Sequence, residues 1–511
     1  MTADSAAGGA PAPAPHRVLI TLSVMLASIM QALDNTIANV ALPRIQGSLS
    51  ATQDQMTWVL TSYIIAAAIM TPLSGWLAGQ VGRRRVFLFS VVGFTVASAL
   101  CGLAQSLPEI VLARLFQGMC GAALIPMSQA VLLDINPPDQ HAKAMAMWVT
   151  AVTIGPILGP ALGGWLTENY NWRWVFYINV PFGILSFLGI LTFMPETKLR
   201  KLRFDFFGFA ALSFAIGALQ LMLDRGQLKD WFSSTEIWIE AIVSGLAFYL
   251  FIIHMLTTSK PAFVSPALFK DRNFVTGNVF IFIVGVVLFA TLALLPPLLQ
   301  DLLNYPVLLT GLVTAPRGIG TLAAMFIVGR LMGKVDTRLI IAAGFALTAI
   351  SLWQMTGFYL QMDSSLVVWS GLAQGLGTGF VYVPLAAITF ATLSPQFRNE
   401  GTALFSLTRN VGSSVGISVV ETLFTRNTQM MHSRLAEQIT PYGDARHSDG
   451  STALTTHGLA MLNQGVTDQA AMIAYNNDFK LMMVLTLCVI PLVVLLRTGR
   501  QNNRAEPVVI E

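Results

Sequence analysis

Long apolar runs separated by short polar stretches form the dominant pattern along this 511-residue chain. A helix needs about 20 mostly apolar residues to cross the hydrocarbon core of a bilayer. Fourteen runs have that character, at approximately 18–42, 56–78, 86–104, 107–133, 144–166, 174–194, 206–223, 235–256, 274–299, 307–329, 339–360, 366–393, 402–424 and 478–496. The pattern therefore predicts an all-α integral membrane protein with fourteen transmembrane helices.

The composition agrees with a chain that lies mostly in lipid. Hydrophobic residues make up 54% of the sequence and charged residues 11%, whereas soluble domains carry roughly 25% charged residues. The net charge of +4 gives no reason to expect nucleic acid as a partner. The three cysteines lie inside apolar runs, which indicates small packed hydrophobic residues rather than a disulfide framework or a metal site.

The positions of the basic residues predict the orientation. Lys and Arg are concentrated in alternate connections between the runs, as at 83–85 and 198–203. Because the cytoplasmic loops of membrane proteins carry the excess of Lys and Arg, this pattern puts both termini in the cytoplasm.

The runs group into two halves of six helices with a two-helix insert between them. We expect a disordered cytoplasmic N-terminus at 1–17, an N-terminal half at 18–195, a linker with two additional helices at 196–273, a C-terminal half at 274–497 and a cytoplasmic tail at 498–511. The connection 425–477 is long and polar, and it predicts an extracytoplasmic loop. Either a disordered segment or an amphipathic element resting on a partner fits its composition.

Two sequence matches indicate an internal repeat of the six-helix halves. The segment 75–86, GWLAGQVGRRRV, shares Gly, Leu, Gly and Val in register with the segment 329–340, GRLMGKVDTRLI. The pair Gln-Gly recurs at 117–118 and 374–375, in the fourth run of each half. Many transporters consist of such repeats, with the binding site near the midplane between them. Close packing of small residues is the alternative explanation for a single match.

Asp34 and Arg114 are the two intramembrane charges to which we assign a chemical role. A charged side chain within a membrane costs roughly 2.5–3.5 kcal/mol on insertion scales, so each one needs a reason. Asp34 lies two-thirds of the way along the first run, where a carboxyl group can bind and release a proton as water access changes sides. Arg114, in the fourth run, is its natural partner. A carboxylate locked permanently to an arginine is the structural alternative.

The remaining polar residues inside the runs predict a buried polar network. Arg317 follows the helix-breaking Pro316 and is expected to bind carbonyl groups that the proline leaves free. Asp134, at the cytoplasmic end of the fourth run, is expected to be solvated. The network residues are Gln117, Arg317, Arg409 and Asn410.

A stripe of glycines marks the fifth run. Gly155, Gly159, Pro160, Gly163 and Gly164 follow the pattern GxxxGPxxGG. Glycines four residues apart form a smooth face that lets another helix approach closely, and the proline permits a kink. This pattern resembles the antiporter signature of the major facilitator superfamily.

Other motifs extend this resemblance over the whole chain. LDNTIANVALP at 33–43 resembles the first-helix signature of the 14-span drug:proton antiporters, and Arg114-x-x-Gln117-Gly118 resembles the superfamily's fourth-helix motif. The segment 75–86 resembles its cytoplasmic loop motif, with Gly79 in place of the usual acidic residue. The motif residues retained here include Gly75, Gly82, Arg83 and Arg84. The resemblance implies a major facilitator fold, an EmrB-type exporter, and a role for Asp34 and Arg114 in proton coupling.

The sequence thus predicts a proton-coupled antiporter that exports amphipathic toxic compounds across the inner (cytoplasmic) membrane of a bacterium. Dedicated export of one endogenous metabolite, such as a siderophore or fatty acid, is the alternative, and a channel or membrane-embedded enzyme is a distant one. The sequence has no phosphate-binding loop, metal-ligand cluster or hydrolase grouping. We therefore expect no enzyme and no cofactor, with protons as the coupling ion. The resemblance also implies, where the host has two membranes, a periplasmic adaptor and an outer-membrane channel as partners.

Overall fold

The computed structural model describes residues 16–137, 140–196, 204–258, 262–437 and 456–496. Residues 1–15 of the predicted disordered N-terminus and the predicted cytoplasmic tail lie outside the described residues, as does the centre of the predicted loop, 438–455. Arg17 is already part of α1. The helices are α1 (Arg17–Leu49), α2 (Gln53–Val81), α3 (Arg83–Leu103), α4 (Leu107–Gly121), α5 (Leu124–Ile135), α6 (His141–Asn169), α7 (Trp174–Tyr177), α8 (Asn179–Phe193), α9 (Phe206–Arg225), η2 (Trp231–Ser233), α10 (Thr235–Thr257), η3 (Pro266–Lys270), α11 (Arg272–Pro297), η4 (Leu298–Leu302), α12 (Val307–Thr314), α13 (Pro316–Leu331), α14 (Thr337–Met355), α15 (Ser364–Ala391), η5 (Pro395–Phe397), α16 (Arg398–Glu437), α17 (Thr456–Val489) and η7 (Ile490–Leu495).

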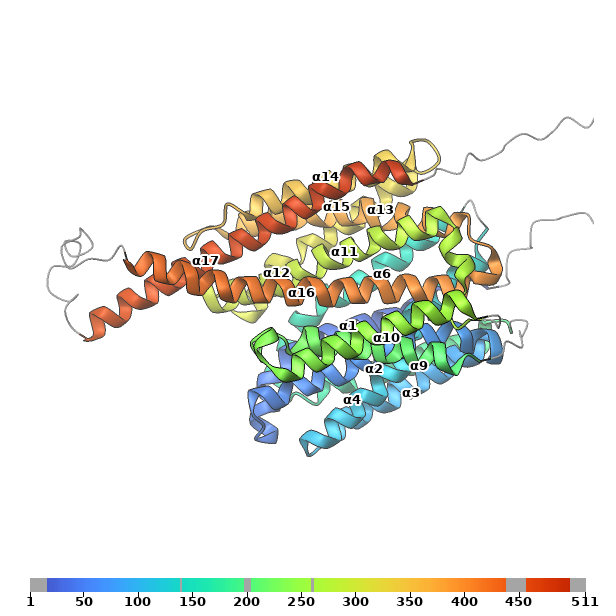
Figure 1. Cartoon of the computed structure of the whole chain (residues 1–511), viewed down its shortest axis with the longest axis horizontal. Helices are drawn as coiled ribbons and strands as arrows, with labels where there is room; N and C mark the ends of the chain where they lie inside the picture. The colour runs from blue at the N-terminus through green and yellow to red at the C-terminus, as the bar shows by residue number, and fades with distance from the viewer. Residues whose placement is uncertain (1–15, 138–139, 197–203, 259–261, 438–455, 497–511) are drawn as a thin grey trace, which may run out of the picture.

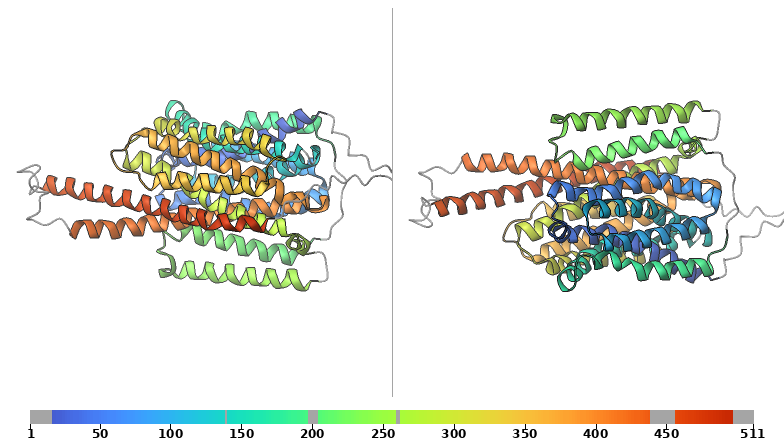
Figure 2. Two further views of the ribbon diagram at one scale, coloured as in Figure 1. Left: turned by 90° about the horizontal axis from the view of Figure 1, so that it is seen from above. Right: turned by 90° about the horizontal axis from the view of Figure 1, so that it is seen from below.

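The described helices form one elongated bundle. Helices α1–α8 form the N-terminal half and α11–α17 the C-terminal half, and the two halves lie side by side in Figure 1. The inserted helices α9 and α10 lie along one flank, where α9 packs against α2 of the first half and α16 of the second (Figure 2). We call the end at which α1 begins and η7 ends the terminal end, and the opposite end the hairpin end.

Twelve helical stretches within the described ranges are long and apolar enough to cross a membrane. Helices α6 and α16 are not among these twelve, although both run along the bundle beside the others (Figure 1). The polar positions 425–437 make α16 as a whole much less apolar than its first part. The structure is therefore an all-helical, multi-pass membrane bundle.

Several of the predicted continuous spans are divided; the run 174–194, for example, begins as α7 and continues as α8. The predicted run 107–133 is divided into α4 and α5, and 307–329 into α12 and α13. A proline cannot donate a backbone hydrogen bond, and its ring clashes with the carbonyl group four residues earlier. Pro126 stands four residues after Ala122, at the first break, and Pro316 begins α13 at the second.

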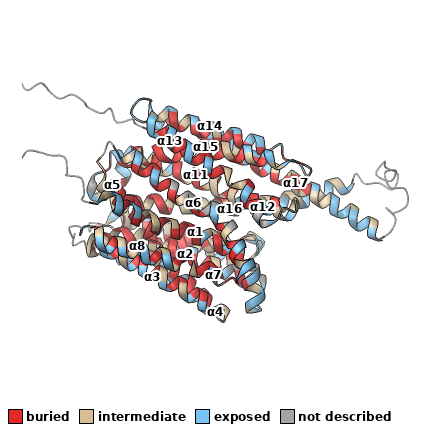
Figure 3. Cartoon of the chain, turned by 180° about the vertical axis from the view of Figure 1, so that it is seen from behind, coloured by how far each residue is buried: buried red, intermediate tan, exposed pale blue. Residues whose placement is uncertain are grey.

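The predicted connection 425–477 is helical over most of its length, which excludes a disordered segment there in the described residues. Helix α16 continues to Glu437 and α17 begins at Thr456, so the last two spans extend into a projecting pair of helices. Figures 1 and 2 show this pair reaching beyond the other helices at the hairpin end. Its residues are largely half-buried or exposed (Figure 3). The polar sequence reflects helices that leave the apolar bundle, since polarity alone does not stop a helix.

The internal repeat is visible in how the second and fourth helices of each half cross. A methyl group added at Gly118 of α4 would collide with the backbone carbonyl group of Tyr63 in α2. A methyl group at Gly375 of α15 would collide likewise with that of Arg317 in α13. The two crossings use residues at matching positions of the repeat predicted from the sequence. Only glycine permits this approach of backbones in either half.

We expect Gly118→Ala and Gly375→Ala each to lower the free energy of unfolding by about 1–3 kcal/mol, because the added carbon overpacks a helix crossing. Thermal unfolding of the purified protein in detergent measures this loss. The matched control is Gly245→Ala in α10, where no atom lies within 4 Å of the added carbon. Equal melting temperatures for all three variants would contradict this packing account.

Candidate functional site

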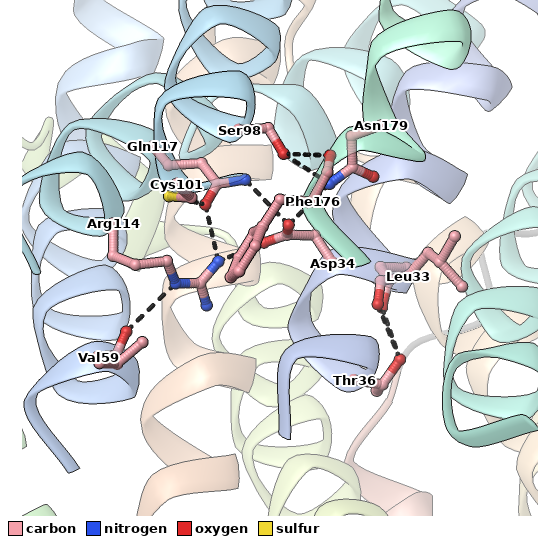
Figure 4. A network of polar contacts seen from close by, with 11 residues as sticks. Leu33, Asp34, Thr36, Val59, Ser98, Cys101, Arg114, Gln117, Phe176 and Asn179 are labelled. Atoms are coloured by element: carbon pink, nitrogen blue, oxygen red, sulfur yellow. Dashed lines mark hydrogen bonds and ion pairs between the residues drawn. The ribbon is translucent and has the colours of Figure 1, made fainter. Parts of the chain in front are cut away.

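Asp34 lies at the centre of a fully buried polar cluster in the N-terminal half (Figure 4). Its Oδ2 atom is 2.7 Å from Nη1 of Arg114. Its Oδ1 atom accepts hydrogen bonds from Nε2 of Gln117 at 2.9 Å and from Nδ2 of Asn179 at 2.8 Å. Helices α1, α4 and α8 thus each contribute to the binding of one carboxylate. The sequence prediction that Asp34 and Arg114 form a pair is confirmed.

The Arg114 guanidinium is held on several sides. Its Nε donates to the carbonyl oxygen of Val59 at 3.2 Å, and its Nη1 also donates to Oε1 of Gln117 at 2.7 Å. The guanidinium carbon lies 4.4 Å from the ring centre of Tyr63 and 5.8 Å from that of Phe176. Aromatic faces attract a cation most when water is excluded. These contacts therefore hold the Arg114 guanidinium in position in addition to its ion pair with Asp34.

Asn179 and Ser98 are site residues that the sequence analysis missed. Asn179 donates to Asp34 and also to Oγ of Ser98 at 3.0 Å, and Ser98 in turn donates to the carbonyl oxygen of Phe176 at 2.8 Å. All of these side chains are fully buried. The sequence feature that could have identified this part of the site is Asn179 itself, because it is an amide near the start of an otherwise strongly apolar run.

The arrangement balances one negative and one positive charge away from water. An ion pair of this kind is strongly stabilised only while both partners are present, because removal of either leaves an unpaired buried charge. Protonation of Asp34 would neutralise the carboxylate and release the guanidinium for another acceptor. The site can therefore exist in two charge states that differ in how firmly α1 is held against α4.

The glycine stripe of α6 packs directly against the turn of α1 that contains Asp34. A methyl group at Gly155 would meet the backbone of Ala32 and Leu33, with the Leu33 nitrogen at 2.6 Å. One at Gly159 would collide with Oγ1 of Thr36, a hydroxyl that donates to the carbonyl oxygen of Gly155 at 3.1 Å. The stripe thus couples the position of α6 to that of the carboxylate.

The rest of the motif continues along α6. Gly163 and Gly164 are buried there. The side chain of Pro160 is not among those that the structure describes.

The residues predicted to form a buried polar network, Gln117, Arg317, Arg409 and Asn410, have different partners. Gln117 belongs to the Asp34 cluster, since it is one turn from Arg114 on the same face of α4. Arg317 donates to the carbonyl oxygen of Leu288 at 3.5 Å. Arg409 donates to the hydroxyl of Tyr382 at 3.0 Å and to the side chain of Asn410. These residues lie at separate places because their helices present them to different neighbours.

Asp134, expected to be solvated, is exposed, and it also bridges the two halves at the terminal end. It forms ion pairs with Arg83 at the start of α3 and with Arg398 at the start of α16, the latter at 2.9 Å. Gly82 precedes Arg83 with φ of 97°, a left-handed conformation that favours glycine. The loop motif therefore turns the chain so that Arg83 points at an acid shared with the other half.

A second contact brings the halves together at this end. A methyl group at Gly75 would lie 3.0 Å from the backbone carbonyl oxygen of Asn399 and 3.2 Å from Cα of Glu400. Arg84 of the same motif hydrogen-bonds the carbonyl oxygen of Leu191 and lies 3.9 Å from the carboxylate of Glu196, both within the first half. Gly75 and Asp134 thus connect the halves, whereas Arg84 does not.

For the buried pair, Arg114→Gln should lower the free energy of unfolding by about 3–5 kcal/mol, because the Asp34 charge is then unpaired. The double variant Asp34→Asn/Arg114→Gln should recover much of that loss. Unfolding of the single and double variants measures the coupling between the two residues.

The control for that cycle is Glu236→Gln, which removes the carboxylate of a partly exposed ion pair with Arg225. We expect this change to cost less than about 1 kcal/mol. Strictly additive losses in the Asp34–Arg114 cycle would show that the two charges do not stabilise each other.

Comparison with known proteins gives the chain its family. The sequence pattern of the Major Facilitator Superfamily matches residues 24–417. The chain is 37% identical to "Multidrug export protein EmrB" of Escherichia coli (strain K12), over 90% of this chain and 92% of that protein. It is 38% identical to "Fatty acid resistance protein FarB" of Neisseria gonorrhoeae, over 93% of this chain and 95% of that protein.

A solved structure has the same fold. The human organic anion transporter MFSD10 (TETRAN) superposes with a TM-score of 0.59 at 15% sequence identity, covering 92% of this chain and all of that one. At that identity the likeness concerns the fold alone. Together with the sequence relatives and the buried Asp34 cluster, it agrees with the resemblance inferred from the motifs. The chain belongs to the major facilitator superfamily, as an EmrB-like multidrug exporter.

Proposed function

We propose that this protein is a proton-coupled antiporter that exports amphipathic toxic small molecules across the cytoplasmic membrane of a bacterium. The observation that carries the proposal is the fully buried Asp34, paired with Arg114 and packed through its own turn against the glycine stripe of α6. The export activity named for the EmrB relatives supports the same conclusion.

Asp34 is the group that binds the transported proton in this proposal. While it is ionised, it attracts Arg114 and two amide donors. Protonation removes the negative charge, so the guanidinium loses its main electrostatic partner. A cationic substrate bound nearby favours the ionised form, whereas a proton from outside favours the neutral form. Proton and substrate therefore compete, which is the requirement for exchange.

Movement of one half against the other supplies the change in access. The ion pairs of Asp134 with Arg83 and Arg398 join the halves at the terminal end. In the proposed cycle they form when that end closes and break when it opens. Because the Gly155–Gly159 face of α6 contacts the turn of α1 that contains Asp34, movement of α6 shifts the environment of the carboxylate.

The membrane arrangement follows from the same proposal. Counting α6 and α16 with the twelve apolar stretches gives fourteen crossings. An even number puts both termini on one side, and the concentration of Lys and Arg in the connections at the terminal end supports a cytoplasmic location for that side. The hairpin end then faces the outside of the cytoplasmic membrane.

Export of a fatty acid is the second candidate function. FarB, a relative named for fatty acid resistance, is as similar to this chain as the EmrB proteins are. A fatty acid is an amphipathic anion, whereas many toxic drugs are amphipathic cations. The two candidates therefore differ in the charge that the substrate presents to Arg114 and Asp34.

A periplasmic adaptor and an outer-membrane channel are proposed partners. The projecting parts of α16 and α17 support an external contact, because they extend beyond the bundle (Figure 3). They also expose Met430, Leu459 and Met461.

Asp34→Asn should abolish substrate accumulation driven by a pH gradient, because the amide cannot bind a proton reversibly at this site. Uptake of ethidium and of oleate into inverted membrane vesicles with an imposed pH gradient measures this, and the preferred substrate separates the two candidates. Asp468→Asn is the control, since Asp468 lies on the projecting part of α17 and pairs with Gln464. Gradient-driven uptake of either compound by Asp34→Asn at the wild-type level would refute the proton role.

Asp134→Asn should shift the protein toward conformations in which the halves are apart at the terminal end, since it removes the shared acid. Spin labels at the exposed residues Lys143 and Lys334, one in each half, report this separation by pulsed electron paramagnetic resonance. We expect a larger long-distance population in Asp134→Asn than in the unsubstituted protein. Identical distance distributions would show that these ion pairs do not hold the halves together.

A further inference from the structure

The C-terminal half contains a rearranged counterpart of the Asp34 cluster. In the first half, Nε2 of Gln117 donates to Asp34. In the second half, Nε2 of Gln374 in α15 donates to Oγ1 of Thr291 in α11 at 3.1 Å. Each hydrogen bond joins the fourth helix of a half to its first helix. Thr291 therefore occupies the place of Asp34, and the second half has no carboxylate there.

The cation near this site also comes from a different helix in each half. Arg317 of α13 stands in the place of Tyr63, because each presents its backbone carbonyl group to the glycine of the fourth helix, Gly375 or Gly118. The position that matches Arg114, one turn before Gln374, is Gly371, and a carbon added there would lie 3.8 Å from Cβ of Arg317. Arg317, one of the buried cations of the second half, thus comes from its second helix.

The acid of the second half is Asp478 on α17. This helix is the sixth of its half, as α8 with Asn179 is in the first half. Asp478 is one turn from Met482. The sulfur of Met482 accepts a hydrogen bond from the hydroxyl of Thr291 at 3.8 Å. The Asp478 side chain is 1% exposed, and within the described part of the chain neither carboxyl oxygen has a hydrogen-bond partner. A buried carboxyl group without a partner requires an explanation.

The neighbours of Asp478 on its own helix pack into an apolar cluster. These neighbours on α17, Tyr475, Phe479 and Met482, share that cluster with residues of α11, α14 and α16. An unpaired charge is strongly disfavoured in such a place, and a carboxyl group there binds a proton instead.

No cation faces Asp478 from the elements that pack against it, as far as the described residues extend. The titratable group in electrostatic range is Tyr475, which also interacts with Asp301 of η4. Glu421 of α16 interacts with Asp224 of α9, and Lys480 of α17 is exposed. Arg317 donates to the Leu288 carbonyl oxygen instead. Burial without an opposite charge therefore favours the protonated form of Asp478.

We propose that Asp478 is a second proton-binding site, located in the C-terminal half and distinct from Asp34. In this conformation its carboxyl group carries a proton, and it returns that proton to water when the half rearranges and hydrates it. Each half then has one protonatable carboxyl group, paired with a cation in the first half and unpaired in the second. The transport consequence rests on the proposed antiport, whereas proton binding itself does not.

Infrared spectroscopy of the purified protein tests proton binding directly. We expect a C=O stretching band of a protonated carboxyl group at neutral pH that disappears in Asp478→Asn and persists, shifted, in Asp478→Glu. The control Asp468→Asn, on the exposed part of the same helix, should leave this band unchanged. A spectrum of folded Asp478→Asn identical to that of the unsubstituted protein would overturn the proposal.

Proteoliposomes with the membrane potential clamped at zero test the transport consequence. The steady-state ethidium gradient at each imposed pH gradient gives the number of protons exchanged per ethidium molecule. We expect Asp478→Asn to exchange one proton fewer than the unsubstituted protein and Asp468→Asn to be unchanged. An unaltered ratio in Asp478→Asn would overturn the coupling role. Absence of any proton-driven gradient in the unsubstituted protein would instead refute the proposed antiport, and the infrared result would stand independently.

Discussion

The N-terminal half is organised around one electrostatic constraint, the need to neutralise a carboxylate inside a membrane. Asp34 is stable there because Arg114 supplies the opposite charge and two amides supply hydrogen bonds. These groups and their supports come from helices α1, α2, α3, α4, α7 and α8. A change in the charge of Asp34 therefore alters the packing of the whole half.

Glycines couple the Asp34 cluster to the packing of the surrounding helices. Gly155 and Gly159 bring α6 into backbone contact with the turn of Asp34, and Gly75 brings α2 against the start of α16. In lipid, where apolar burial does not drive helices together, such close approach is the main source of helix association. The Asp34 cluster and the contact between the halves are thus connected by helices that cannot move independently.

The sequence predicted the class of fold and the central pair from general physical rules. Run lengths predicted the helices, and the cost of intramembrane charge singled out Asp34 and Arg114. It could not show that Arg317 and Arg409 face different neighbours, because helix rotation depends on tertiary packing. The polar composition of 425–477 led to the prediction of a loop, whereas the described residues there belong to helices that leave the bundle. Asn179 and Asp478 were missed as buried polar groups because each lies near the end of a run, where polar residues usually meet water.

Proton release upon substrate binding tests the central claim, that substrate and proton compete at Asp34, most directly. Purified protein in weakly buffered detergent solution, mixed with ethidium in the presence of a pH indicator, should release protons into the medium. Asp34→Asn that still binds ethidium should release fewer, because the amide carries no exchangeable acid. Equal proton release from Asp34→Asn and the unsubstituted protein would contradict the account.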